Sequence, residues 1–246
     1  MNDAPSAVPS LSVVAPMYNE AGGAASLVRE IAAALSDIDH EIIMIDDAST
    51  DETLSVLKSA QAGIPQLRIL RHEHNAGQSR AIRSGVMAAR AAVIATLDGD
   101  GQNDPADIPE LYRKLTESGG ALAMVAGERQ ARQDSAAKKI ASRAANAIRR
   151  RLLKDGAADT GCGLKAFRRD AFLQLPYFDH MHRYLPALMA REGFAVAFVP
   201  VSHRPRRHGR SKYTNWGRAL VAVRDLMGVT WLIARARRPG EITEET

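Results

Sequence analysis

Short apolar runs alternate with segments of helical spacing through the first half of the chain. Runs of β-favouring residues that end at proline or acidic residues predict strands. These runs are Leu11–Pro16, Glu41–Asp47, Leu67–His72 and Val93–Leu97. Each is followed by a predicted helix, at Ala24–Leu35, from Ser49 to about Ala60, at Gln78–Ala91, and from Asp104 to about Leu115. This alternation predicts an α/β fold with right-handed crossovers and a mostly parallel sheet.

Two of the helix starts carry specific signals. Ser49 is followed three residues later by Glu52, which predicts a capping box. Asp104 precedes Pro105, the pattern of an N-cap followed by proline at the first helical position.

The second half has a less regular pattern. We expect a strand at Leu122–Arg129, a basic helix at Ser135–Leu153, a late strand at Ala195–Arg204 and a long helix at Trp216–Arg235. No internal repeat or low-complexity linker divides the chain. The pattern therefore predicts one domain, residues 1–213, followed by an amphipathic helix and tail at residues 214–246.

The composition is that of a globular protein with a mild positive excess. Lys and Arg number 33 against 28 Asp and Glu, a formal net charge of +5. This excess suits phosphate-bearing molecules, anionic lipid or nucleic acid without choosing among them. The single cysteine, Cys162, excludes an internal disulfide and favours a reducing compartment; we expect it to be a small buried residue. The N-terminus lacks a secretory pattern, and no apolar stretch is long enough to span a bilayer.

Acidic and polar residues follow the predicted strands where the strands end. These residues are Tyr18, Asn19, Glu20, Asp46, Asp47, Asp98 and Asp100. In a parallel sheet such ends meet at one edge, where ligands bind. Asp98 and Asp100 are separated by Gly99 alone, and carboxylates this close repel unless a cation lies between them. By itself such a triplet is as often a solvated turn, but the acids at neighbouring strand ends favour a site for Mg²⁺ or Mn²⁺.

Eight stretches of the sequence resemble one enzyme family. VVAPMYNE, IIMIDDAST, NAGQSRAIRSG and TLDGDGQNDP, in this order, resemble the family-2 glycosyltransferases with the GT-A fold. The D-x-D-x-Q pattern is similar to that of the branch that makes polyprenyl-phosphate sugars, such as dolichol-phosphate mannose synthase. AGER, KKIASRAAN, DTGCGLKAFRRD and RRHGRSKY extend the resemblance over most of the chain. It implies a GT-A (nucleotide-diphospho-sugar transferase), Rossmann-like catalytic domain with helices on both faces of the sheet.

The resemblance also implies a donor site and a metal corner. The nucleoside of a sugar-nucleotide would contact Pro16, Tyr18, Glu20, Asp47 and the backbone of Ile45. Asp98, Asp100 and Gln102 would bind the metal and the donor diphosphate, with Gly99 permitting close approach. The residues expected to meet phosphate charge are Arg129, Lys139, Ser142, Arg183, Arg206 and Lys212. Of these sets, Asp98, Asp100 and Arg129 are the expected catalytic residues. Without the resemblance, Pro16 would simply end a strand, Tyr18 would pack on the sheet edge, and the arginines would be solvated.

The implied reaction is inverting transfer of a sugar from a GDP- or UDP-linked donor to a polyprenyl phosphate. A phosphate monoester has a second pKa of about 6, so it is already dianionic near neutral pH and needs no general base. The protein must hold this acceptor and stabilise the departing nucleoside diphosphate. The Q-x-x-R-W motif of processive polysaccharide synthases is absent, which disfavours a polymerase.

The terminal helix carries an apolar stripe at three- and four-residue steps. Its members are Trp216, Leu220, Val223, Met227, Trp231 and Ala234, with charged residues on the other side. A helix of this kind is typical of the membrane interface. The alternatives are packing on its own domain or in a homodimer. Because the implied acceptor lies in a membrane, we expect a cytoplasmic protein attached peripherally to the inner face of the membrane.

Three alternatives remain open. A GT-A transferase acting on a saccharide or protein hydroxyl would need a general base, for which Asp159 is the candidate. A sugar-nucleotide-forming enzyme would need a basic glycine-rich loop after the first strand, and APMYNEAGG contains no Arg or Lys. A nucleic-acid binder would use Arg149–Arg151 and Arg204–Arg210, but the acids at the strand ends would repel a phosphate backbone. We therefore expect no nucleic-acid partner.

Overall fold

Strands and helices alternate along the chain as the sequence predicts. The computed structural model describes residues 8–129, 149, 151–153, 155–157, 159–205 and 215–237, with backbone alone at 215–220. The strands of this part are β1 (Leu11–Met17), β2 (His40–Asp46), β3 (Leu67–Arg71), β4 (Val93–Thr96), β5 (Met124–Arg129), β6 (Lys165–Arg168) and β7 (Val196–Val201). The helices are α1 (Ala21–Ala34), α2 (Thr53–Gln61), α3 (Gln78–Ala88), α4 (Ile108–Thr116), α6 (Arg169–Leu173), α7 (Leu185–Glu192) and α8 (Asn215–Ala234), with short 3₁₀ turns η1 (Pro105–Asp107) and η2 (Met181–Arg183).

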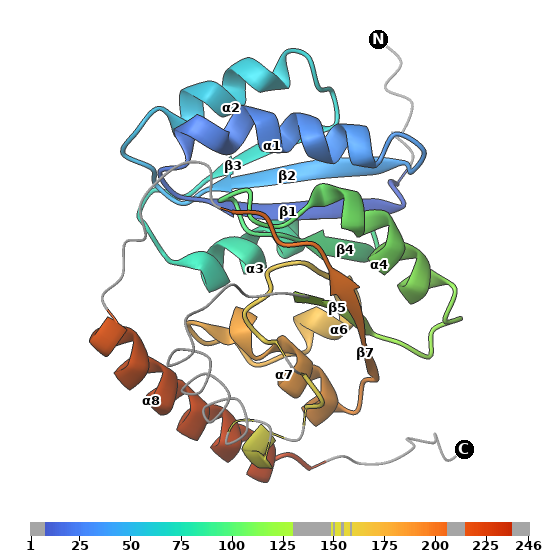
Figure 1. The fold of residues 1–246 in the computed structure, drawn as a ribbon, viewed down its shortest axis with the longest axis vertical. Coiled ribbons are helices and arrows are strands. Elements are labelled where there is room, and N and C mark those ends of the chain that lie inside the picture. The colour runs from blue at the N-terminus through green and yellow to red at the C-terminus, as the bar shows by residue number, and fades with distance from the viewer. Residues whose placement is uncertain are drawn as a thin grey trace, which may run out of the picture.

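The strands form one seven-stranded sheet in the order β3-β2-β1-β4-β6-β5-β7. All neighbouring strands are parallel except that β6 runs antiparallel to both β4 and β5. Helices cover both faces of the sheet (Figure 1). The sheet is therefore mostly parallel, as expected.

β1 lies inside the sheet, with β2 on one side and β4 on the other. The chain builds outward from β1 through β2 and β3, and then crosses back to place β4 on the opposite side. Such a reversal of strand order opens a crevice outside the carboxyl ends of the strands. Met17 and Asp46, the last residues of β1 and β2, are register partners at this edge.

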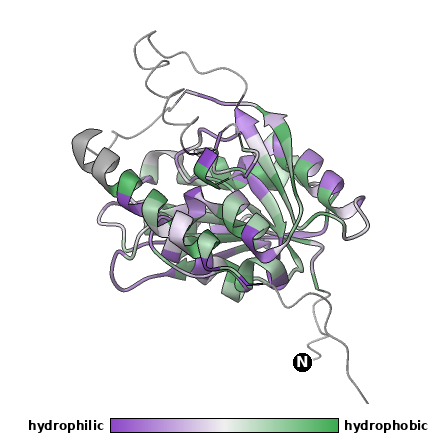
Figure 2. Ribbon diagram, turned by 90° about the horizontal axis from the view of Figure 1, so that it is seen from below, coloured by the Kyte–Doolittle hydropathy of each residue, from purple (hydrophilic) through white to green (hydrophobic). Residues whose placement is uncertain are grey.

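Apolar residues pack into two cores, one on each face of the sheet. α1, α2 and α4 cover one core, to which Ile31 and Leu111 belong. α3, α6, α7 and α8 cover the other, to which Phe167 and Val229 belong. Hydrophobic residues gather along the strands and alternate with hydrophilic ones on the helices (Figure 2). Coverage on both faces explains why every position of β2 is buried instead of every second one.

The cap predicted at Asp104 is confirmed. Its carboxylate accepts a hydrogen bond from the Ala106 N–H at 3.0 Å, and Pro105 is the first residue of η1. The turn then continues into α4.

The capping box predicted at Ser49 is wrong. α2 begins at Thr53, and the Ser49 side chain does not cap it. Ser49 Oγ instead accepts a hydrogen bond from the Asn19 N–H at 3.0 Å, and Asp51 accepts from the Thr53 N–H at 3.0 Å. The Ser49 hydroxyl, which the local sequence pattern predicts to cap α2, therefore binds the loop after β1 instead.

The second half contains elements that the pattern did not predict. β5, β7 and α8 lie where they were expected, but β6, α6 and α7 were not predicted. β6 is only four residues long and begins with the charged Lys165, so it carries little strand signal of its own. Most of the basic segment Ser135–Leu153 lies outside the described residues.

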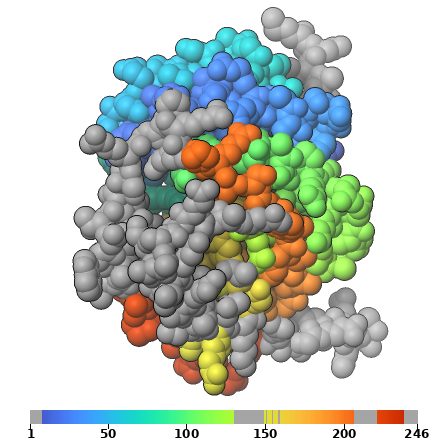
Figure 3. All heavy atoms as spheres, in the orientation of Figure 1, coloured from blue at the N-terminus to red at the C-terminus, as the bar shows by residue number. Residues whose placement is uncertain are grey.

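α8 packs against the domain through one side. Val229 is buried, and Arg191 Nε donates a hydrogen bond to Leu232 O at 3.0 Å. On the other side Val223, Met227 and Trp231 are 55%, 63% and 60% exposed. The described part of the predicted stripe therefore faces outward. Parts of α8 are visible at the lower edge of the molecule in Figure 3. Within the described part of the chain, none of the helices combines the length and apolar character that crossing a membrane requires.

Candidate active site

The loops after β1 and β2 are tied together at the carboxyl edge of the sheet. Asn19 Oδ1 accepts a hydrogen bond from the Thr50 N–H at 2.7 Å, and the Glu20 N–H donates to Thr53 Oγ1 at 2.9 Å. Asn19 has a φ of 55°, in the left-handed region that asparagine tolerates. These bonds hold the two loops as one rim of the crevice.

Asp47 is buried, and both of its carboxylate oxygens bind the loop that precedes α3. Oδ1 accepts from the Ala76 N–H at 2.9 Å and Oδ2 from the Gly77 N–H at 2.8 Å. His72 Nδ1 lies 2.6 Å from Oδ1. Asp47 therefore fixes this loop, a role that the sequence did not indicate. Its contact with a nucleoside stays a prediction.

The Asp98-Gly99-Asp100 turn lies against the end of β1. A Cβ atom at Gly99 would lie 2.4 Å from both Met17 Sδ and Pro16 O, so only glycine fits there. A Cβ atom at Gly163 would lie 2.3 Å from Asp98 Oδ1. Gly99 thus packs on the end of β1, and the Asp98 carboxylate lies against the backbone of Gly163.

Asp98 lies in an environment that disfavours its charge. Burial raises the pKa of Asp98 and the charge of Asp100 raises it further, against the opposite effects of Lys165, a Gln78 hydrogen bond and Arg129. Gln78 Nε2 donates that bond to Asp98 Oδ1 at 2.7 Å. A bound cation would stabilise the charged form of such a carboxylate.

Asp100 shapes the remainder of the corner. Its Oδ1 accepts a hydrogen bond from the Gln102 N–H at 3.1 Å. The Gln102 carbonyl accepts from the Arg204 N–H at 2.9 Å. The chain that leaves β7 is therefore attached directly to the acidic turn.

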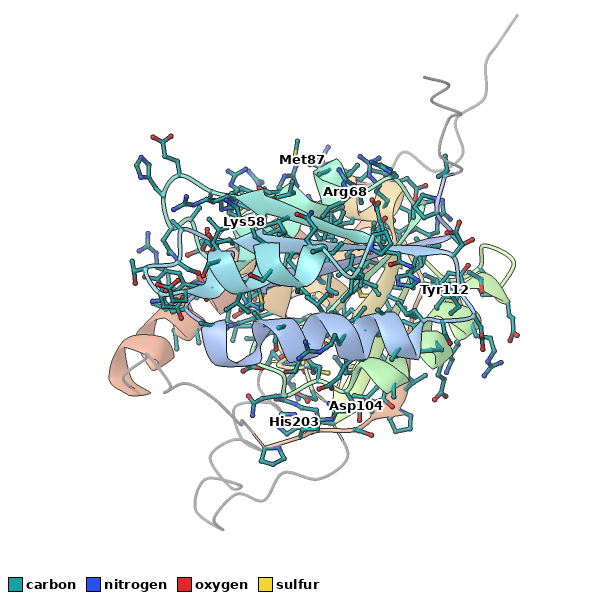
Figure 4. The ribbon with its side chains drawn as sticks, turned by 90° about the horizontal axis from the view of Figure 1, so that it is seen from above. Lys58, Arg68, Met87, Asp104, Tyr112 and His203 are labelled. Carbon is teal, nitrogen blue, oxygen red and sulfur yellow. The ribbon has the colours of Figure 1, made fainter. Side chains whose placement is uncertain are left out.

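The Arg204 side chain reinforces this attachment. Its Nη2 lies 2.6 Å from Asp104 Oδ1, and its Nη1 pairs with Glu30 of α1. His203 forms a β-bridge with Asn103. Figure 4 shows Asp104 and His203 on the same side of the molecule. Ion pairs and backbone bonds together fix where the chain enters the basic RRHGRSK segment.

Arg129, at the end of β5, forms a bidentate ion pair with Asp159. Arg129 Nε lies 2.5 Å from Oδ2 and Nη2 lies 2.8 Å from Oδ1, with side chains only 12% and 17% exposed. The Asp159 hydrogen bond raises the pKa of Arg129, and Asp98 is among the charges that act in the same direction. Gly161 packs on the guanidinium, because a Cβ there would lie 2.7 Å from Nη2. Arg129 is therefore held in one orientation close to Asp98.

Lys165 is a buried charge that the sequence did not indicate. It pairs in register with Thr96 of β4, and its Nζ donates to the Cys162 carbonyl. Burial lowers the pKa of Lys165, against the effects of Cys162, Asp98 and Asp159. A lysine inside the apolar run GLKAF was the available signal. Cys162 is buried as expected, and burial raises the pKa of its thiol.

Arg183 lies in η2, which packs on the first turn of α3. Ser79 Oγ lies 2.7 Å from His182 Nδ1 and accepts from the His182 N–H at 3.3 Å. Burial lowers the pKa of His182 well below its ordinary value, so this imidazole is neutral at physiological pH. α3 thus brings the η2 segment next to the Asp98 corner.

The crevice edge brings most of the predicted residues together. Pro16, Tyr18, Glu20, Ile45 and Asp47 lie at or near the ends of β1 and β2, Asp98 to Gln102 follow β4, and Arg129 ends β5. The Ile45 side chain is buried in the core. Lys139, Ser142, Arg206 and Lys212 lie outside the described residues.

The acidic corner has a donor set suited to a nucleotide-bound cation. Within the described ranges, no group of three or more His, Cys, Asp or Glu side chains is arranged around a metal site. Asp98 and Asp100 supply two carboxylates. Mg²⁺ typically binds through one or two carboxylates together with substrate phosphates and water, and Mn²⁺ takes the same oxygen ligands. The residues present therefore fit either ion.

The reversal of strand order beside β1 and the acid pair at that point define an α/β fold of the GT-A type. The family model Glycosyl transferase family 2 matches residues 12–175, and the chain belongs to this family.

Curated relatives extend the match. Dodecaprenyl-phosphate galacturonate synthase of Rhizobium johnstonii is 36% identical over 237 residues, which cover 94% of this chain and 69% of the relative. Undecaprenyl-phosphate 4-deoxy-4-formamido-L-arabinose transferase of Enterobacter sp. is 34% identical over 212 residues, 85% of this chain and 64% of the relative. The chain thus spans about two-thirds of the length of these relatives.

Solved structures of glucosyl-3-phosphoglycerate synthase from Mycobacterium tuberculosis share the fold. The complex with Mn²⁺, UDP-glucose and glycerol 3-phosphate has a TM-score of 0.68 at 19% identity and covers 94% of this chain and 82% of that one. The complex with Mn²⁺, UDP and glucosyl-3-phosphoglycerate has a TM-score of 0.70 at 18% identity, with the same coverage. This likeness confirms the expected GT-A fold.

Proposed function

We propose that the protein transfers a sugar from a nucleotide-sugar to a polyprenyl phosphate, with inversion at the anomeric carbon. The curated relatives described above are named for dodecaprenyl and undecaprenyl phosphates. Within this chain, the observation that carries the proposal is the Arg129–Asp159 pair next to Asp98.

The Arg129–Asp159 pair favours a phosphate acceptor over a hydroxyl acceptor. A hydroxyl acceptor needs a carboxylate that takes up its proton, and Asp159 is the candidate base. Both oxygens of Asp159 are engaged with Arg129, and Oδ1 also accepts from the Gly161 N–H at 3.0 Å. A carboxylate stabilised in this way is a weak base. A phosphate acceptor requires no base, and a fixed arginine beside the metal corner suits it.

The predicted site residues would have three roles: metal binding, donor binding and acceptor binding. Asp98, Asp100 and Gln102 would hold Mg²⁺ or Mn²⁺, which when bound neutralises charge on the leaving nucleoside diphosphate. Arg129, oriented by Asp159, would bind a phosphate group. The donor nucleoside is proposed to contact Pro16, Tyr18, Glu20, Ile45 and Asp47. The acceptor phosphate is proposed to contact Lys139, Ser142, Arg183, Arg206 and Lys212.

Transfer assays with two acceptors test this function. A thermal-shift panel of UDP- and GDP-sugars with Mn²⁺ or Mg²⁺ first identifies the donor. Labelled sugar should then pass to undecaprenyl phosphate and not to a soluble saccharide. Asp159→Asn should reduce this transfer less than Arg129→Met, because it leaves the phosphate-binding guanidinium in place. Loss of a general base would cost about 10²–10⁴-fold. The proposal would be contradicted if Asp159→Asn lost transfer activity to this extent while Arg129→Met did not. It would also be contradicted if the sugar passed only to the saccharide.

We also propose that α8 attaches the protein to the membrane that contains the acceptor. Val223, Met227 and Trp231 form an exposed apolar stripe, and Arg235 Cζ lies 6.0 Å from the centroid of the Trp231 ring. Arginines beside interfacial tryptophan suit a helix that lies at a headgroup layer. A nucleotide-sugar donor is found in the cytoplasm, so the proposed position is the inner face of the membrane.

Liposome flotation tests this attachment. Binding should be strongest with anionic lipid at low salt and should weaken as salt screens the charges. If the protein does not bind liposomes and light scattering gives twice the mass of one chain, the stripe forms a homodimer interface instead.

A further inference from the structure

The first turn of α3 reaches directly into the acidic corner. Gln78, the first residue of α3, donates from Nε2 to Asp98 Oδ1 at 2.7 Å. Among the residues that the structure describes, Oδ2 of Asp98 accepts no hydrogen bond. One oxygen of the carboxylate is therefore oriented by a neutral amide while the other is left for a different ligand.

Gln78 is itself held in place by Asp47, the residue that follows β2. Asp47 binds the amide groups of Ala76 and Gly77 at 2.9 and 2.8 Å, and Asn75 Nδ2 donates to the Asp47 carbonyl at 3.0 Å. Gly77 has a φ of 84°, a conformation that turns the chain into α3. Asp47, the loop and Gln78 thus form one continuous set of bonds that ends on Asp98.

The chemistry of this set indicates its purpose. An amide donor fixes a carboxylate without competing for the cation as a charged group would. Side chains that hydrogen-bond a metal ligand set its orientation, and their replacement typically lowers metal affinity about 10–100-fold. We propose that Gln78 is a positioning residue for Asp98 and that Asp47 acts on the metal corner through Gln78. This inference rests on the proposed function, because it assumes that Asp98 binds a cation.

Mn²⁺ binding measured by EPR, with the protein alone and with UDP or GDP, tests the role of Gln78. Gln78→Met keeps the length of the side chain and removes the donor, so Mn²⁺ affinity should fall about tenfold or more. Gln174→Met, at an exposed glutamine beside α6, is the matched control and should bind Mn²⁺ like the wild type.

A double-mutant cycle tests the role of Asp47. Asp47→Asn retains a single acceptor oxygen for two amide groups, so it should weaken Mn²⁺ binding even when no nucleotide is present. If Asp47 acts through Gln78, the double variant should bind Mn²⁺ no more weakly than Gln78→Met. Effects that multiply would overturn this part of the inference. If Asp47→Asn fails to fold, Asn75→Ala replaces it, because it releases the loop without changing the carboxylate.

The remaining readouts separate positioning from a general structural defect. Gln78→Met should keep a single cooperative unfolding transition, and high Mn²⁺ should restore its transfer rate, which a misfolded protein would not allow. Wild-type affinity for Mn²⁺ in Gln78→Met would overturn the inference while leaving the proposed function intact. A wild-type chain that binds no Mn²⁺ under any of these conditions would overturn both.

Discussion

At the scale of single residues, the position of the Asp98 carboxylate depends on a glycine from a distant part of the chain. A Cβ atom at Gly163 would lie 2.3–2.5 Å from the carboxylate atoms of Asp98, closer than any real contact. Gly163→Ala should therefore turn Asp98 away and lower Mn²⁺–nucleotide affinity about tenfold, measured by calorimetry. Gly63→Ala is the control, because nothing lies within 4 Å of a Cβ there. Equal affinity in the two variants would show that the carboxylate adjusts without cost.

A second residue-scale prediction concerns a buried carboxylate in β2, outside the site. Glu41 accepts from Ser12 Oγ at 2.6 Å, from the Arg90 N–H at 2.7 Å and from Arg68 Nη1 at 2.5 Å. Burial acts to raise the pKa of Glu41, but these hydrogen bonds and the charge of Arg68 lower it below the ordinary 4.5. A carboxylate whose pKa is lowered by folding stabilises the folded state at pH values above its pKa in the unfolded chain. That stabilisation is lost as pH falls through its pKa in the folded protein.

Glu41→Gln should therefore unfold at a lower temperature than the wild type at pH 7. Loss of hydrogen bonds to a buried charge costs about 1.5–3 kcal/mol, or about 3–12 °C for a chain of this size. The difference should narrow as pH falls below 4.5 and through the lowered pKa of Glu41, because the wild-type carboxyl then also becomes protonated. Glu117→Gln, at an exposed pair with Arg113, should change the unfolding temperature little. A constant difference at all pH values would contradict the charge-based explanation.

At the scale of elements, α8 allows its two sides to be tested separately. Met227→Ser with Trp231→Ser changes the exposed stripe and should reduce liposome binding without lowering the unfolding temperature. Val229→Ser changes the packed side, which is 1% exposed, and should lower that temperature while binding persists. If the stripe double variant is the destabilised one in lipid-free buffer, the stripe is buried in protein, as in a homodimer.

The elements also show what the sequence could predict. β1 to β4 were predictable because each is an apolar run followed by a helical segment, a pattern that local propensity and crossover rules determine. β6 was not, because its four residues gain their hydrogen bonds only from β4 and β5. Ser49 misled for a similar reason, since its hydroxyl binds Asn19, 30 residues away.

The same distinction applies to the site. Asp98 and Asp100 were predictable, because the strand that precedes them determines where they lie. Gln78, Gly163 and Lys165 contribute from other elements, and only the folded sheet brings them to Asp98. Strand ends can be read from periodicity, whereas the residues that orient a carboxylate depend on tertiary packing.

At the scale of the whole molecule, the metal corner and the proposed membrane helix are joined by continuous contacts. Gln78 binds Asp98, and Ser79 beside it binds His182 of η2. On the far side of η2, His180 Nδ1 lies 3.1 Å from Asp225 of α8. The loop that carries Arg183 is therefore held between α3 and α8. This arrangement suits an acceptor whose phosphate must reach the crevice while its lipid stays in the membrane.

The pH dependence of sugar transfer tests whether the attacking group of the acceptor is a phosphate. If the acceptor phosphate itself attacks the sugar, kcat/KM for undecaprenyl phosphate should rise through its second pKa of about 6 and level off above pH 7. Asp159→Asn should keep the shape of this profile, because Asp159 orients Arg129 and takes up no proton. A phosphonate analogue of the acceptor, whose second pKa is higher, should move the inflection to higher pH. An inflection that stays fixed when the acceptor changes, and vanishes in Asp159→Asn, would assign the proton to the enzyme and favour transfer to a hydroxyl.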